Sequence, residues 1–153
     1  MQKYKIGYTA GVFDMFHIGH LNILKRAKEL CDFLIVGVST DELVQDYKHK
    51  TPIIPYAERS AIVEAIKYVD KVVPQKNMDK LEMVKEFGID VVFVGSDWKG
   101  TSKWINYERS FAEVGCIVVY LSHTDGISSS LLRDKLNKGS KISNKKQEEC
   151  ASE

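Results

Sequence analysis

Two histidines three positions apart, His17 and His20, are the residues whose types and spacing most directly suggest chemistry. They stand in the stretch GVFDMFHIGH, where an apolar run gives way to a pattern typical of a helix. Residues three apart on the first turn of a helix project from the same side. As imidazolium ions or as neutral N–H donors, the two rings could therefore neutralise charge on a phosphate during its transfer.

The main chain around these histidines is also suited to binding an anion. A strand is expected to end between Thr9 and Val12, so the helix that follows begins at the carboxyl edge of a sheet. The first turn of a helix has unpaired N–H groups and the positive end of the helix dipole. Gly11 would let the chain bend, and Gly19 would let a phosphate approach the backbone closely.

Two other interpretations of the histidine pair are open. His17 and His20 could ligate a metal ion, but zinc requires further His, Cys or carboxylate ligands, and only Asp14 is close in sequence. They could also cap the helix or lie half-buried without contacting a ligand. The sequence around them, which forms one of several ordered motifs, favours a functional role.

Short apolar runs alternate along the chain with segments of helical periodicity, as in a parallel sheet covered by helices. Strands are expected at 4–9, 33–39, 71–74, 91–95 and 116–121. Helices are expected from His17 onward and at 40–47, 56–69, 79–88, 104–114 and 128–136, with a loop over 48–55. This order predicts a single-domain α/β fold with a doubly wound, Rossmann-like parallel sheet of five strands. Ligands of such sheets bind at the carboxyl ends of the strands.

The composition narrows the range of partners. Lys and Arg total 22 against 21 Asp and Glu, a net charge of +1, so no broad field indicates a nucleic-acid or membrane-surface partner. The three scattered cysteines argue against a disulfide framework, and no stretch approaches the ~18 apolar residues of a membrane span. We expect a cytoplasmic protein with one domain over residues 1–138 and a polar, disordered tail over 139–153.

Several motifs in a fixed order resemble those of the nucleotidyltransferase superfamily. The similarity is closest to the cytidylyltransferases that act on glycerol 3-phosphate, phosphoethanolamine and phosphocholine. The motifs are GVFDMFHIGH, DFLIVGVSTDEL, the lysines near position 50, YAERSAIVEAIKYVDKVVP, VGSDW and TDGISSS. The resemblance implies transfer of CMP from CTP to an alcohol phosphate, above all glycerol 3-phosphate. It also implies Mg²⁺ held mainly by the nucleotide phosphates, and a homodimer.

The resemblance further implies roles for single residues. His17 and His20 would bind the triphosphate and stabilise the transition state, and Lys48 or Lys50 would reach the α-phosphate and the acceptor phosphate. Lys48 is assigned with the histidines to the catalytic group. Arg59 would either orient its helix or pair with a phosphate, and Asp97 would lie near the nucleotide. The other residues expected around the nucleotide are Thr9, Ala10, Gly11, Val12, Phe13, Asp14, Gly19, His123, Thr124, Gly126, Ile127, Ser128, Ser129 and Ser130.

Two departures from the family pattern leave alternatives open. The arginine expected before T-x-G-I-S is His123 in this chain, so its contact with a phosphate would depend on protonation. Ser128, Ser129 and Ser130 would offer hydroxyls at a second helix N-terminus, but the ISSS string also resembles that of adenylyltransferases. The alternatives are an adenylyltransferase of the same fold that uses ATP, and a nucleotide-binding module without catalytic activity.

Overall fold

A five-stranded parallel sheet forms the middle layer of the structure, a computed structural model that describes residues 3–122 and 129–139. The strands are β1 (Tyr4–Gly11), β2 (Cys31–Ser39), β3 (Lys71–Gln75), β4 (Val91–Gly95) and β5 (Ile117–Leu121). Their order across the sheet is β3-β2-β1-β4-β5, so the direction of winding reverses between β1 and β4. This topology confirms the predicted Rossmann-like α/β fold and puts the expected ligand crevice at the carboxyl end of β1.

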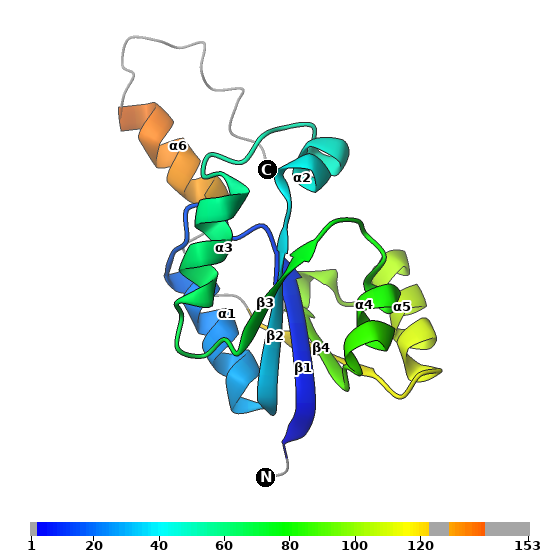
Figure 1. Ribbon diagram of the computed structural model, residues 1–153. Coiled ribbons are helices and arrows are strands. Elements are labelled where there is room, and N and C mark those ends of the chain that lie inside the picture. Colours follow the sequence, from blue (N-terminus) through cyan, green and yellow to red (C-terminus); the bar gives the residue numbers. More distant parts are fainter. Residues whose placement is uncertain (1–2, 123–128, 140–153) are drawn as a thin grey trace.

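Helices cover both faces of the sheet (Figure 1). They are α1 (Ile18–Glu29), α2 (Asp41–Lys48), α3 (Tyr56–Glu64), α4 (Lys80–Phe87), α5 (Ser102–Ala112) and α6 (Ser129–Gly139), with a short 3₁₀ helix, η1 (Ser96–Trp98). In Figure 1, α1, α3 and α6 lie on one side, α4 and α5 lie on the other, and α2 stands at the carboxyl edge. Among the described residues, no helix has the length and apolar character needed to cross a bilayer.

Two apolar cores explain why the central strands are apolar on both faces. Val36 and Val38 of β2 pack with Leu24 of α1 and Val63 of α3 on one face. Ile35, which directly precedes Val36 in the sequence, joins a second core on the α4 and α5 face. Because successive side chains of a strand point to opposite faces, a strand buried on both sides reads as a continuous apolar run, as 33–39 does.

The helix predicted over residues 56–69 is shorter in the structure, because α3 ends at Glu64. After it, the N–H groups of Ala65 and Ile66 bind carbonyls three residues earlier, the tighter pattern that closes many helices. Ile66 and Val69 still pack against the core of the α1 and α3 face. Their spacing therefore keeps a helical period in the sequence although the chain is already turning toward β3.

Lys48 belongs to a helix rather than to the loop predicted over 48–55. The Thr40 hydroxyl caps the start of α2, and α2 continues to Lys48. His49 then takes a left-handed conformation with φ 56°, which ends the helix. Lys48 is thus anchored at a helix end at the carboxyl edge of the sheet, whereas Lys50 lies in the loop.

Candidate active site

The loop between β1 and α1 carries the histidines, and Asp14 holds this loop in place. The Asp14 carboxylate is buried and accepts hydrogen bonds from the N–H groups of Ile53 and Ile54, each at 2.9 Å. The Arg133 guanidinium of α6 pairs with the same carboxylate at 2.8 Å. Phe13 and Met15, on either side of Asp14, have φ values of 55° and 50°, a region costly for residues other than glycine. The contacts of Asp14 oppose this strain and fix the loop.

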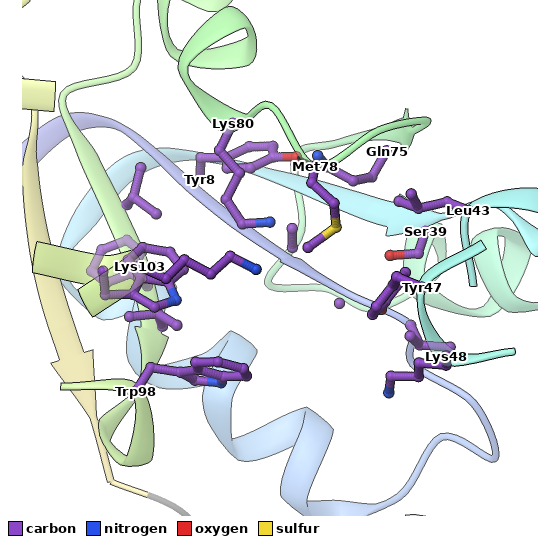
Figure 2. A pocket seen from close by; sticks show the side chains of 17 residues that line it. Tyr8, Ser39, Leu43, Tyr47, Lys48, Gln75, Met78, Lys80, Trp98 and Lys103 are labelled. Carbon is purple, nitrogen blue, oxygen red and sulfur yellow. Dashed lines mark hydrogen bonds between the residues drawn. The ribbon is translucent and has the colours of Figure 1, made fainter. Parts of the chain in front are cut away.

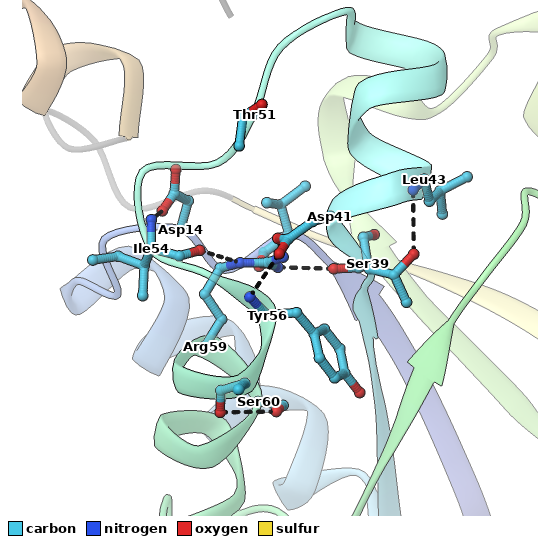
Figure 3. Close-up of polar contacts among 12 residues, drawn as sticks. Asp14, Ser39, Asp41, Leu43, Thr51, Ile54, Tyr56, Arg59 and Ser60 are labelled. Atoms are coloured by element: carbon cyan, nitrogen blue, oxygen red, sulfur yellow. Dashed lines mark hydrogen bonds and ion pairs between the residues drawn. The ribbon is translucent and has the colours of Figure 1, made fainter.

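Arg59 joins the same loop to the ends of two strands (Figure 3). Its side chain is fully buried. The guanidinium donates to the backbone oxygens of Val12 at 2.7 Å, Ser39 at 2.8 Å and Ile54 at 2.7 Å, and it pairs with the Asp41 carboxylate at 2.6 Å. Of the two roles expected for Arg59, these contacts support the structural one, because the chain itself uses most of the guanidinium donors.

His17 and His20 both cap helix α1. The Nδ1 atom of His17 accepts a hydrogen bond from the N–H of Gly19 at 3.1 Å, and the Nδ1 atom of His20 accepts one from the N–H of His17 at 3.2 Å. A ring nitrogen that accepts a hydrogen bond carries no proton, so the proton of each neutral ring lies on Nε2. Both histidines therefore cap the helix, and these contacts also set the tautomer that makes each Nε2 a donor.

Burial keeps both rings neutral. It lowers the pKa of His17, and it lowers the pKa of His20 to about 4, helped by the neighbouring His17, against a smaller opposing effect of Asp14. The two rings stack with centroids 3.9 Å apart. Two imidazolium ions at this distance would repel each other, so the stacking favours neutral rings. The His17 Nε2 atom is buried and finds no hydrogen-bond partner within the described part of the chain. Such an orphaned donor indicates that a further acceptor belongs beside it.

A cavity of about 540 Å³ opens at the carboxyl ends of the strands, on the α4 and α5 side (Figure 2). Tyr8 forms part of its wall, and the Tyr8 hydroxyl donates to the side-chain oxygen of Gln75 on β3. Gly37 lies beneath this contact, because a Cβ there would come within 2.0 Å of the Tyr8 hydroxyl oxygen. Glycine at this position lets the tyrosine reach across β2 and leaves the cavity open above it.

Three lysines line this cavity. Lys48 of α2, Lys80 of α4 and Lys103 of α5 all contribute to it, and Trp98 of η1 forms part of the wall. In Figure 2 the chains of Lys80 and Lys103 extend together into the cavity from one side, and Lys48 lies across from them. The cavity is therefore strongly cationic and has a size typical of small-molecule sites.

The structure brings most of the other predicted residues to the same edge. Ala10, Gly11 and Val12 line the cavity. Thr9 is buried, and its hydroxyl donates to the Phe93 oxygen on β4. Phe13 packs against the His20 ring, the Gly19 N–H is taken by His17, and Asp97 is exposed on η1.

The last predicted segment is only partly described. His123, Thr124, Gly126, Ile127 and Ser128 lie outside the described residues. The backbones of Ser129 and Ser130 begin α6. The expectations for their side chains stay predictions.

Sequence reasoning missed Lys80 and Lys103. Each lies in the first turn of a helix that follows a strand, Lys80 after β3 and Lys103 after β4. Because the carboxyl ends of parallel strands meet at one edge, every such first turn is a candidate for a site, and this signal was available. Arg133 was missed as well, since its pairing with Asp14 spans 119 positions.

No group of three or more His, Cys, Asp or Glu side chains within residues 3–122 and 129–139 is arranged to hold a metal ion. Asp14, the carboxylate nearest the histidines in sequence, is committed to Ile53, Ile54 and Arg133. A resident metal centre built on the histidine pair is therefore not supported within these residues. A magnesium ion that arrives with a nucleotide would take its ligands from phosphate oxygens and water.

A family model described as "Cytidylyltransferase-like" matches residues 8–135 of the chain. The chain belongs to the cytidylyltransferase-like family. It is a nucleotidyltransferase of this family.

Known relatives agree with this assignment. A glycerol-3-phosphate cytidylyltransferase of Staphylococcus aureus is 40% identical over 129 residues, which cover 84% of this chain and 92% of the relative. A solved lipopolysaccharide core biosynthesis protein from Thermoplasma volcanium is 26% identical, with a TM-score of 0.65, and the match covers 78% of this chain and 96% of that protein. A pantoate-beta-alanine ligase from Francisella tularensis, 12% identical with a TM-score of 0.60 over 85% of this chain and 65% of the ligase, shares the fold.

The capping role of His17 and its expected catalytic role can be separated by substitution. In His17→Asn the amide oxygen replaces Nδ1 as the cap, but no donor remains at the position of Nε2. We expect kcat to fall roughly a hundredfold or more, as for loss of one preorganised donor, with little change in the free energy of unfolding. His17→Ala should lose the same activity and in addition ~1 kcal/mol of stability. Near-normal turnover of His17→Asn would leave His17 with a capping role alone. Steady-state kinetics and urea unfolding measure the two effects.

Acid should destabilise the fold through His20. The ring titrates near ~6.5 in the unfolded chain and at about 4 in the folded one. Its neutral form is thus favoured by folding. The contribution of neutral His20 to the free energy of unfolding is complete above pH ~6.5, and it is lost as the pH falls toward about 4. Urea unfolding at pH 7.5 and pH 5 should show a larger loss for the wild type than for His20→Asn, which keeps the acceptor but does not titrate. Equal losses would contradict the lowered pKa.

Proposed function

We propose that the protein transfers CMP from CTP to an alcohol phosphate, with glycerol 3-phosphate as the expected acceptor, and releases pyrophosphate. The observation that carries the proposal is the pair of neutral histidines at the start of α1, with Nε2 donors set by the caps, next to a lysine-lined cavity. The relative from Staphylococcus aureus, at 40% identity, supports CTP and glycerol 3-phosphate as the substrates.

The reaction would be a direct displacement. A phosphate oxygen of the acceptor attacks the α-phosphorus of CTP, and the bond from that phosphorus to the oxygen that bridges to the β-phosphate breaks. Pyrophosphate leaves with the bonding electron pair. Because the acceptor phosphate is already ionised, the step needs neither a covalent nucleophile nor a general base. The protein's contribution is to position two polyanions and to neutralise the charge that builds between them.

The residues of the site divide this work. The Nε2–H groups of His17 and His20 would donate to phosphate oxygens, and Lys48, at the end of α2, would act as a point charge on the reacting phosphates. Neutral donors suit this role because the hydrogen bonds they offer do not depend on pH near neutrality. Mg²⁺ bound to the CTP phosphates would supply further positive charge to the leaving pyrophosphate. A homodimer and a cytoplasmic location stay predictions.

Nucleotide preference tests the proposal. With Mg²⁺ and glycerol 3-phosphate, CTP should support pyrophosphate release at least about tenfold faster than ATP, a difference of ~1.4 kcal/mol in transition-state binding. Removal of Mg²⁺ with a chelator should stop the reaction, and replacing the metal should restore it. Equal or faster turnover with ATP would favour the adenylyltransferase. Nucleotide binding without turnover on any alcohol phosphate would favour the non-catalytic module.

A further inference from the structure

The cavity has two cationic ends, and the roles assigned so far use only one of them. Lys48 stands at one end, where Gly11 and Val12 line the cavity and lead to the histidine-bearing loop. Lys80 and Lys103, which we call the lysine pair, extend into the cavity from the opposite side (Figure 2). Because the reacting phosphates belong at the Lys48 end, the lysine pair would face a part of the acceptor that does not react.

The lysine pair has no counter-ion among the residues that the structure describes. No Asp or Glu of this part of the chain lines the cavity, and none of its carboxylates forms an ion pair with Lys80 or Lys103. Asp79, next to Lys80 in the sequence, instead caps α4 by accepting hydrogen bonds from the N–H groups of Leu81 and Glu82. The nearest carboxylate in the sequence therefore serves the helix and not the ammonium.

The two ammonium groups of the lysine pair repel each other. Burial, and after it the charge of Lys103, lowers the pKa of Lys80 to about 8. Lys80 is thus still mostly charged at neutral pH, although it is half-buried. A bound anion would pair with both charges and would remove the repulsion between them.

The aromatic wall of the cavity raises the opposite option, a cationic ligand. Trp98 and Trp104 line the cavity, and aromatic faces bind quaternary ammonium groups. However, the ammonium of Lys103 lies 5.7 Å from the centroid of the Trp98 ring, so the chain's own cation already occupies this face. A further cation would meet two lysines, with no carboxylate in the described lining to balance it. These contacts favour an anion.

We propose that the lysine pair binds a second anionic group of the acceptor, so that the site prefers alcohol phosphates that carry a carboxylate at the end remote from the phosphate. This inference rests on the proposed function and extends it. The acceptor phosphate would lie at the Lys48 end, as the displacement requires, and the bonds that form and break stay the same. The carboxylate would take no part in the chemistry, and its two oxygens would give each ammonium of the lysine pair one acceptor. Glycerol 3-phosphate would place only a neutral hydroxyl there, which is a weaker partner.

A matched pair of acceptors tests the proposal. Glycerol 3-phosphate and 3-phosphoglycerate carry the same phosphate and differ at the remote carbon, which is a CH₂OH group in the first and a carboxylate in the second. Both are used as racemates, so that the configuration of the middle carbon does not enter. At saturating CTP and Mg²⁺, the wild type should have a kcat/KM for 3-phosphoglycerate about tenfold or more above that for glycerol 3-phosphate, the factor for a charge-assisted hydrogen bond in place of a neutral one. Equal or poorer use of 3-phosphoglycerate would overturn the proposal.

Removal of one charge should abolish this preference. Lys80→Gln and Lys103→Gln should each lower kcat/KM for 3-phosphoglycerate about tenfold more than kcat/KM for glycerol 3-phosphate, mainly through KM. Lys80→Arg, which keeps the charge, should retain the preference. Lys85→Gln, on the exposed side of α4, is the matched control and should keep the wild-type ratio. An equal fall for both acceptors would overturn the proposal, because the lysines would then act on the phosphate that the two acceptors share or on the fold.

Failure of the proposed function gives a different result. If the wild type releases no pyrophosphate from CTP with either acceptor, transfer of CMP to these alcohol phosphates is wrong. Calorimetric titration of both compounds into the wild type and the two glutamine variants then still tests the lysine pair. Tighter binding of 3-phosphoglycerate than of glycerol 3-phosphate to the wild type, with the difference lost in both variants, supports the anion site. Any other pattern, including no binding in any of the three proteins, overturns it.

Discussion

The site depends on the hydrogen bonds and the ion pair that the buried guanidinium of Arg59 makes. A buried cation is tolerated only when its donors are satisfied and its charge is paired. Here the acceptors come from the end of β1, the end of β2, the segment before α3 and the start of α2. These four parts of the chain must converge to bury Arg59. Their convergence places the loop that leads to His17 next to the helix that ends at Lys48.

The contacts of Asp14 position the loop that leads to the histidines. Asp14 binds the strained loop to the N–H groups of Ile53 and Ile54 and to Arg133 on α6. The backbone oxygen of the same Ile54 accepts a hydrogen bond from Arg59. The loop can therefore adopt two left-handed residues and present His17 as the N-cap of α1. The caps, in turn, set the tautomer of both imidazoles. The chemistry of neutral Nε2 donors thus depends on a sequence of polar contacts that begins at Arg59.

The sequence predicts the parts of this structure that depend on local pattern. The apolar run over 33–39 and the glycine at position 88, which ends α4 with φ 64°, follow directly from burial on two faces and from helix-capping preference. The end of α3 does not follow, because Ile66 and Val69 keep a helical period for packing reasons alone. Helical spacing predicts which face is buried more reliably than it predicts where the hydrogen bonds stop.

The candidate site is predictable to a similar degree. Its location at the carboxyl edge follows from motif and spacing, and so does the placement of His17 and His20 together at the start of one helix. The protonation of the rings does not, because it depends on which nitrogen accepts a backbone N–H. The approach of Lys80 to Lys103 depends on the strand order, because the connection from β3 to β4 crosses β2 and β1 and brings α4 next to α5. Arg59 shows what the sequence does not reveal, because an arginine that is buried among backbone oxygens and one that binds a phosphate look the same in the sequence.

Arg59→Lys distinguishes these two roles and tests the dependence of the site on the clamp most directly. Lysine keeps the positive charge but cannot make four divergent contacts. The free energy of unfolding in urea should fall by about 1–3 kcal/mol, the scale for leaving buried backbone acceptors without a donor. The Kd for CTP, measured by calorimetry where the variant is still folded, should rise together with this loss of stability, because the clamp positions the loop that leads to His17. A variant as stable as the wild type with clearly weaker CTP binding would contradict the account and make Arg59 a phosphate ligand.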